Sequence, residues 1–157
     1  MFKKAIKTDK APAAVGPYSA GIKLGDFVYL SGQLPIDPVT NQIVEGGIKE
    51  QTHQVLRNTQ AVLGAIGLET RHIVKATCYL KDMNDFAAFN EVYASYFEEP
   101  YPARVCIEVA RLPKDALVEI ESLVIDTLVY EQQMANSCGG CNGGCSDEGN
   151  CCEGCGE

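Results

Sequence analysis

Three side chains that could take part in chemistry alternate along a β-prone stretch at residues 103–110: Arg104, Cys106 and Glu108. Alternation with a period of two places them on one face of a predicted strand, while Val105 and Ile107 face the other way and suit a core. A guanidinium offers a planar fork of donors that binds a carboxylate through two parallel hydrogen bonds. The strand therefore indicates a site for an anionic substrate.

Two carboxylates, Glu119 and Glu121, share one face of the next predicted strand, at residues 117–127. We expect the two strands to form an antiparallel hairpin, with Glu108 near Glu119 and Cys106 near Glu121. A glutamate in such a place could accept a proton from water. A solvated outer face is the alternative interpretation, because charges on edge strands also protect a sheet from aggregation.

The helices and strands that would carry these side chains follow from the hydrophobic periods. We expect strands at residues 27–30, 72–80, 103–110 and 117–127, helices at 48–66 and from Asp82 or Asn84 to 97, and a loop at 33–47. This order predicts an α+β sandwich, in which two helices pack on one face of a mixed β-sheet. An aromatic stripe on the second helix indicates packing; it consists of Phe86, Phe89, Tyr93, Tyr96 and Phe97.

The charge balance limits the partners of the protein. The chain has 157 residues with 13 basic and 21 acidic side chains, which gives a net charge of −8. A nucleic-acid or anionic-membrane surface would need clustered Lys and Arg, so neither partner is expected. The N-terminus resembles no signal peptide, and no apolar run approaches the roughly 18 residues of a membrane span. We therefore expect a cytoplasmic protein in a reducing compartment.

The cysteines divide the chain into a body at residues 1–130 and a linker with an acidic, Gly-rich tail at 131–157. Six of the eight cysteines lie in the last twenty residues: Cys138, Cys141, Cys145, Cys151, Cys152 and Cys155. Two C-x2-C units with two further thiols between them are typical of zinc or iron–sulfur ligation. A disordered or redox-labile thiol tail is the main alternative and structural disulfides a third. The metal content of anaerobically purified protein separates these possibilities.

Several ordered motifs in the body resemble one known family. They are Gly16-Pro17-Tyr18-Ser19, Val28-Tyr29-Leu30-Ser31-Gly32-Gln33-Leu34-Pro35, and the run from Pro102 to Lys114 with the sequence PARVCIEVARLPK. Over residues 6–125 the chain resembles the YjgF/Rid (reactive intermediate deaminase) family, most closely its imine-deaminase branch. The resemblance implies a chorismate-mutase-like fold and a homotrimer with clefts between subunits. It also implies hydrolysis of 2-imino acids such as 2-iminopropanoate (the tautomer of 2-aminoacrylate) and 2-iminobutanoate to 2-keto acids and ammonia, with no metal or organic cofactor.

The same resemblance assigns roles to residues at matching positions. Arg104 matches the arginine that binds the substrate carboxylate, Cys106 the cysteine whose backbone lies beside it, and Glu119 the acid that positions or activates water. Four further residues match positions that line the cleft: Tyr18, Ser31, Gly32 and Asn90. Ordinary structural interpretations stay open for these residues: a loop aromatic over the core, a plain turn, an exposed helix residue and a surface acid.

Other functions remain possible from the sequence. A non-catalytic, chaperone-like trimer with the tail as a metal or redox sensor is the principal alternative to an enzyme. Ribonuclease activity is sometimes attached to this family, but the acidic charge and the lack of a basic patch count against it. Chorismate mutase activity is suggested by the fold alone, and a fold does not carry function.

Overall fold

The computed structural model describes residues 2–14 and 16–138 of the chain, with backbone only for 136–138. The backbone of Cys138 closes the last helix, and the other proposed metal ligands of the tail lie outside the described residues. The elements are β1 (Lys4–Ile6), β2 (Gly21–Leu24), β3 (Phe27–Gln33), α1 (Ile48–Gly64), η1 (Thr70–His72), β4 (Ile73–Leu80), η2 (Met83–Asp85), α2 (Phe86–Ala94), β5 (Ala103–Glu108), η3 (Pro113–Asp115), β6 (Val118–Ile125) and α3 (Leu128–Cys138).

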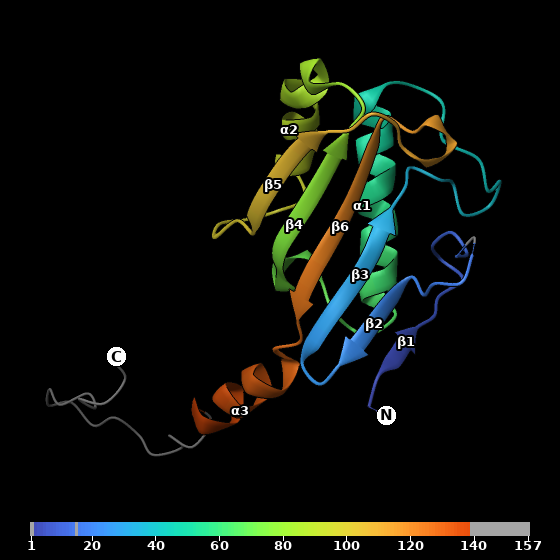
Figure 1. Cartoon of the computed structure of the whole chain (residues 1–157). Coiled ribbons are helices and arrows are strands. Elements are labelled where there is room, and N and C mark those ends of the chain that lie inside the picture. Colours follow the sequence, from blue (N-terminus) through green and yellow to red (C-terminus); the bar gives the residue numbers. More distant parts are fainter. Residues whose placement is uncertain (1, 15, 139–157) are drawn as a thin grey trace, which may run out of the picture. The chain divides into compact units, whose positions relative to one another are not determined.

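The six strands form one mixed sheet in the order β1-β2-β3-β6-β4-β5. All neighbours are antiparallel except β4 and β5, which run parallel. Figure 1 shows α1 and α2 together on one face of this sheet, so the predicted α+β sandwich is confirmed. Neither α1 nor α2 lies on the opposite face of the sheet, which is called the helix-free face below.

The long helix α1 forms where the sequence places an apolar residue every three or four positions. Its buried stripe includes Val55, Leu56, Val62 and Leu63, which meet β3 and β6. At its start the Glu50 carboxylate accepts a hydrogen bond of 2.8 Å from the Gly47 N–H, which satisfies one of the free donors of the first turn. The helix is therefore fixed both by burial and by its N-terminal cap.

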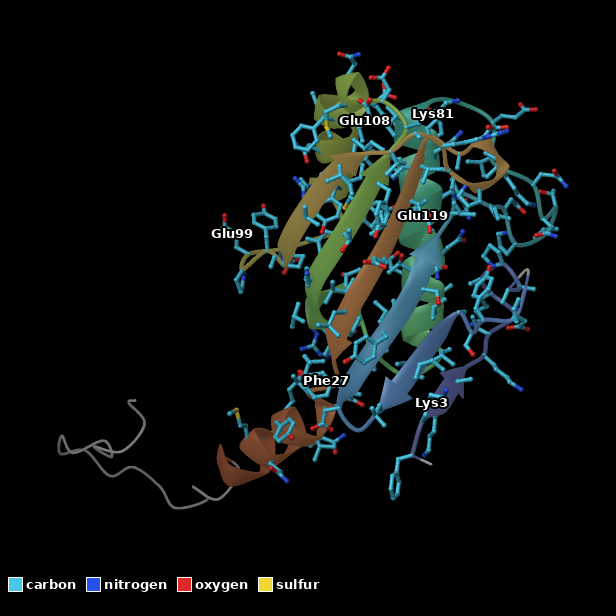
Figure 2. All side chains as sticks on the ribbon, viewed as in Figure 1. Lys3, Phe27, Lys81, Glu99, Glu108 and Glu119 are labelled. Carbon is cyan, nitrogen blue, oxygen red and sulfur yellow. The ribbon has the colours of Figure 1, made fainter. Side chains whose placement is uncertain are left out.

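The predicted hairpin between residues 103–110 and 117–127 is wrong. Strand β5 pairs in parallel with β4, and β6 lies between β3 and β4, so β5 and β6 are not neighbours. The Glu108 carboxylate consequently lies away from Glu119, at the end of β5 (Figure 2), where it accepts a hydrogen bond of 2.7 Å from the Met83 N–H. The hairpin was expected because strands that follow each other in the sequence often pair. In this sheet β4 lies between β5 and β6.

Two apolar residues of β5 that the period assigned to the core are exposed instead. Val105 and Ile107 each keep 42% of their surface, because they point to the face of the sheet that no helix covers. Arg104 and Cys106 take the helix-covered side. The alternation was predicted correctly, but the assignment of faces was inverted.

The chain separates into two compact units, Met1–Thr127 and Leu128–Glu157. The first unit holds the sheet with α1 and α2, and the described part of the second is the helix α3. This helix was not among the predicted elements, and it spans the boundary that the sequence placed at residue 130. In the described part of the chain, no helix is both long and apolar enough to cross a bilayer.

Candidate active site

A cavity of about 430 Å³ gathers four of the predicted site residues: Tyr18, Ser31, Gly32 and Glu119. Tyr18 comes from the segment before β2, Ser31 and Gly32 from the end of β3, and Glu119 from the start of β6. The Ser31 hydroxyl donates a 2.7 Å hydrogen bond to the Ser19 carbonyl, and the Ser31 N–H donates one to Ala20. These bonds tie the segment that carries Tyr18 to the end of β3.

A β-bulge in β3 forms one wall of this cavity. Between the pairs Leu30–Ser122 and Gln33–Ile120, β3 has two residues, Ser31 and Gly32, opposite the single Glu121. A bulge re-aims side chains and is often found beside functional sites. Figure 2 shows Glu119 at the end of β3 that carries this bulge.

Gly32 lies so close to the Glu119 carboxylate that a side chain at this position would push the carboxylate aside. A Cβ atom on Gly32 would stand 1.8 Å from the Glu119 Oε1 atom and 2.8 Å from its Cδ atom. Real Cβ atoms do not approach other atoms this closely, so any side chain at this position displaces the carboxylate. The glycine at position 32 therefore fixes where the acid lies.

Gly32→Ala is expected to lower the turnover number for the expected hydrolysis of 2-imino acids about 100-fold. The new methyl group would displace the Glu119 carboxylate, and a displacement of about 1 Å in a group that takes part in a reaction can cost that much. The melting temperature should change little, because the clash involves the end of a flexible side chain. Gly64→Ala, where nothing lies within 4 Å of the new Cβ, is the matched control and keeps full turnover. Steady-state kinetics and thermal unfolding of both variants test this expectation, which an unaltered turnover in Gly32→Ala contradicts.

The electrostatic environment favours the protonated form of Glu119. Burial raises the pKa of Glu119 above its usual range, and the nearby Glu121 carboxylate raises it further. Burial and the same two carboxylates also raise the pKa of Tyr79. A glutamate with a raised pKa is a better proton acceptor at neutral pH, because its conjugate acid is weaker.

A second group of predicted residues, Arg104, Cys106 and Asn90, lies on β5 and α2. The Arg104 Cζ atom is 4.6 Å from the centre of the Tyr93 ring and 5.5 Å from that of Phe89. Within residues 2–14 and 16–138, no carboxylate pairs with this guanidinium. Its N–H groups also make no hydrogen bond with the described residues, so they are available to a ligand.

Cys106 has the surroundings of an unreactive thiol. Burial raises the pKa of Cys106, although the charge of Arg104 opposes the shift. It is the register partner of Cys78, whose thiol is fully buried and has a pKa raised by burial to about 12. A protonated thiol is a poor nucleophile, so Cys106 fits a positioning role rather than a covalent one.

The two groups lie on opposite faces of the sheet in a single chain. Arg104 is in register with the buried Ala76, and its guanidinium meets the rings of α2, so it points to the helix-covered face. Glu119 is in register with Tyr79, which is in register with the exposed Ile107, so it points to the helix-free face. The structure therefore does not bring all the predicted site residues together within one chain.

Reasoning from the sequence missed several residues of these two groups. Nothing in the sequence around Tyr79 indicated a place near the site, because Tyr79 is simply one residue of an alternating strand pattern. Lys114 lines the cavity with a backbone φ of 56°, and it belongs to the Pro102–Lys114 run without having been singled out. The aromatic stripe was interpreted as packing alone, whereas three of its rings, those of Phe86, Phe89 and Tyr93, contact the Arg104 guanidinium.

Known proteins similar to this chain share nearly all of the body. Residues 8–126 match the model of the family described as Endoribonuclease L-PSP. A RutC family protein of Pyrococcus horikoshii is 57% identical over 78% of this chain and 97% of its own length. A 2-iminobutanoate/2-iminopropanoate deaminase of Salmonella typhimurium is 47% identical over 79% of this chain and 98% of its own. The crystal structure of E. coli TdcF with bound serine superposes with a TM-score of 0.74 at 44% identity, covering 78% of this chain and 98% of that one.

Proposed function

Because this chain belongs to the Endoribonuclease L-PSP family, also called the YjgF/RidA family, we propose that it is a hydrolytic deaminase of 2-imino acids. Its substrates are 2-iminopropanoate, 2-iminobutanoate and their enamine tautomers, and its products are 2-keto acids and ammonia. The name of the Salmonella relative supports this reaction class. The bound serine of the TdcF structure supports a ligand that carries a carboxylate.

The observation that carries the proposal is the unpaired Arg104 guanidinium. The protein has a net charge of −8, yet none of the described carboxylates neutralises this cation. An arginine whose N–H donors are free of carboxylate partners is suited to a bidentate bond with a carboxylate. A 2-imino acid supplies that carboxylate next to its reactive carbon.

The chemistry then requires only orientation, a water molecule and a proton acceptor. With the carboxylate on Arg104, the adjacent imine carbon is held in a fixed place, and water attacks it while Glu119 accepts the water proton. As the new C–O bond forms, the C=N electron pair moves onto the nitrogen of the protonated imine, which gives a neutral tetrahedral carbinolamine. Glu119 returns its proton to this nitrogen, the C–N bond breaks with its electron pair on the leaving ammonia, and the hydroxyl proton passes to Glu119 as the carbonyl forms. Ammonia then takes that proton from Glu119 and leaves as ammonium. One water is consumed for each ammonia released.

The opposite orientation of Arg104 and Glu119 supports a site shared between subunits. In the proposed homotrimer, Arg104 of one chain and Glu119 of the next would line the same cleft. The helix-free face offers a surface for such an assembly, since it exposes several large apolar side chains, among them Phe27, Tyr29, Val105 and Ile107. Exposed apolar surface of this kind is typical of protein–protein contact sites.

The acidic charge does not favour the ribonuclease activity that the family description mentions. Binding to RNA draws most of its free energy from phosphate contacts by Lys and Arg. A chain with eight more acidic than basic side chains lacks the composition for such a surface.

A coupled assay tests the proposed function. A pyridoxal-phosphate threonine dehydratase releases 2-iminobutanoate, and we expect the protein to accelerate the formation of 2-oxobutanoate and ammonia above the spontaneous rate. The control is the same dehydratase flux without the protein. A rate equal to the spontaneous one, from protein whose oligomeric state is verified, contradicts the proposal and favours the non-catalytic binding protein.

A further inference from the structure

Three aromatic rings of α2 surround the Arg104 guanidinium, and we call them the aromatic cage: Phe86, Phe89 and Tyr93. Their ring centres lie 5.7, 5.5 and 4.6 Å from the Arg104 Cζ atom, within the range of a cation–π interaction. The rings come from one helix at spacings of three and four residues, so a single helical face presents all three. Asn90 follows Phe86 by four residues and lies on the same face.

We propose that the aromatic cage orients Arg104 for the substrate carboxylate, with Tyr93 as its principal positioning residue. The inference rests on the proposed function, because it gives Arg104 the role of carboxylate binder. A cation–π contact uses the charge of the guanidinium and none of its five N–H donors. The cage can thus hold the side chain in place while leaving the whole hydrogen-bonding fork to the ligand.

Arg104 needs such support, because in the described part of the chain no ion pair or hydrogen bond restrains its side chain. It is exposed, it lies on the edge strand β5, and no carboxylate pairs with it. A free arginine side chain occupies many rotamers, and fixing one of them on binding lowers the affinity. A contact that fixes the rotamer beforehand increases affinity for the carboxylate without touching it.

Tyr93 acts through its ring rather than its hydroxyl. The side chain is 5% exposed, and its hydroxyl has no hydrogen-bond partner among the described residues. The ring itself is held on both sides, stacked on Phe97 at 4.4 Å between centres and tilted against Phe89 at 5.5 Å. A ring fixed in this way can in turn fix the cation that lies over it.

The test compares Tyr93→Leu with Tyr93→Phe, using calorimetric binding of 2-oxobutanoate and the kinetics of imine hydrolysis. Loss of the ring is expected to weaken 2-oxobutanoate binding and raise KM by about tenfold, with kcat changed less than about threefold. Tyr93→Phe keeps the ring and is expected to restore binding to within about twofold. Phe86→Leu, at a half-buried position, is the second variant and is expected to weaken binding in the same direction should Tyr93→Leu fold poorly.

Tyr96→Leu is the matched control. Tyr96 follows α2 and contacts His53 of α1 instead of Arg104, with ring centres 5.6 Å apart. Its loss is expected to leave 2-oxobutanoate binding unchanged. Unchanged binding in folded Tyr93→Leu and Phe86→Leu, alongside lost binding in Arg104→Ala, overturns the aromatic cage alone. Unchanged binding and activity in Arg104→Ala overturn both the cage and the proposed function.

Discussion

Arg104→Ala is expected to lower kcat/KM for 2-imino acids by about 1,000-fold or more, because it removes both the charge-assisted bond to the carboxylate and the orientation that this bond provides. The fold should survive, since Arg104 is exposed and has no carboxylate partner among the described residues. The lost ring contacts are worth about 0.5–1 kcal/mol at an exposed site. The coupled dehydratase assay measures kcat/KM. Analytical ultracentrifugation shows whether the variant keeps the assembly of the wild type.

Arg104→Lys is the matched control for charge. Lysine keeps the positive charge but has no planar fork, so we expect activity between that of the wild type and Arg104→Ala. Equal activity of the lysine variant and the wild type would mean that charge alone is required. Wild-type activity in the alanine variant would remove Arg104 from the site.

Glu119→Gln is expected to lower kcat by about 100- to 10,000-fold, the usual contribution of a positioned general base. Glutamine keeps the size and the hydrogen-bonding reach of the side chain but cannot accept the water proton. In the wild type, activity should fall on the acid side as Glu119 becomes protonated, in a pH range above that of an ordinary glutamate. Glu121→Gln is the control, and it should move this acid limb to lower pH because a charge that raises the pKa of Glu119 is removed.

Glu119→Gln is also expected to stabilise the folded protein at neutral pH. Burial raises the pKa of Glu119 in the folded state, so the ionised carboxylate costs free energy of folding above that pKa. Glutamine removes this cost, and its advantage should shrink as pH falls through the raised pKa, where the wild-type carboxyl becomes neutral as well. Urea unfolding at several pH values measures the difference. If Glu119→Gln is less stable than the wild type at pH 7, the raised pKa of Glu119 is contradicted.

Mixing the two inactive variants tests whether the site is shared between chains. If each site takes Arg104 from one subunit and Glu119 from the next, a random mixture of Arg104→Ala and Glu119→Gln chains restores about one quarter of the sites in closed rings. Co-expression with two different affinity tags yields the mixed oligomers. A mixture as inactive as its components means that the two residues do not act across an interface.

The local elements could be predicted from the sequence because their signals are local. The period of α1 and the alternation of β4, β5 and β6 each lie within one segment, and the structure confirms these helices and strands. The short strands β1 and β2 were missed, since neither is long enough to give a period. The order of strands failed for another reason: whether β6 pairs with β5 or passes to the far side of β4 depends on the rest of the sheet.

The site was less predictable than the fold, because it depends on geometry that spacing does not contain. The bulge at Ser31 and Gly32 is visible only once β3 is paired with β6. The facing directions of Val105 and Ile107 depend on which side the helices cover. Aromatic residues at helical spacing look the same whether they meet a core or a cation, and so the partner of Tyr93 was not foreseen.

The placement of Arg104 and Glu119 on opposite faces of one sheet has a consequence for how catalysis depends on dilution. A chain that carried both groups in one pocket would keep its specific activity at any concentration. If Arg104 and Glu119 act across an interface, the isolated chain holds only half of each site, so specific activity falls once the protein is diluted below the dissociation constant of its assembly. Turnover per chain would then measure the fraction of chains that are in the oligomer. A newly synthesised subunit would be inactive until it joined other subunits.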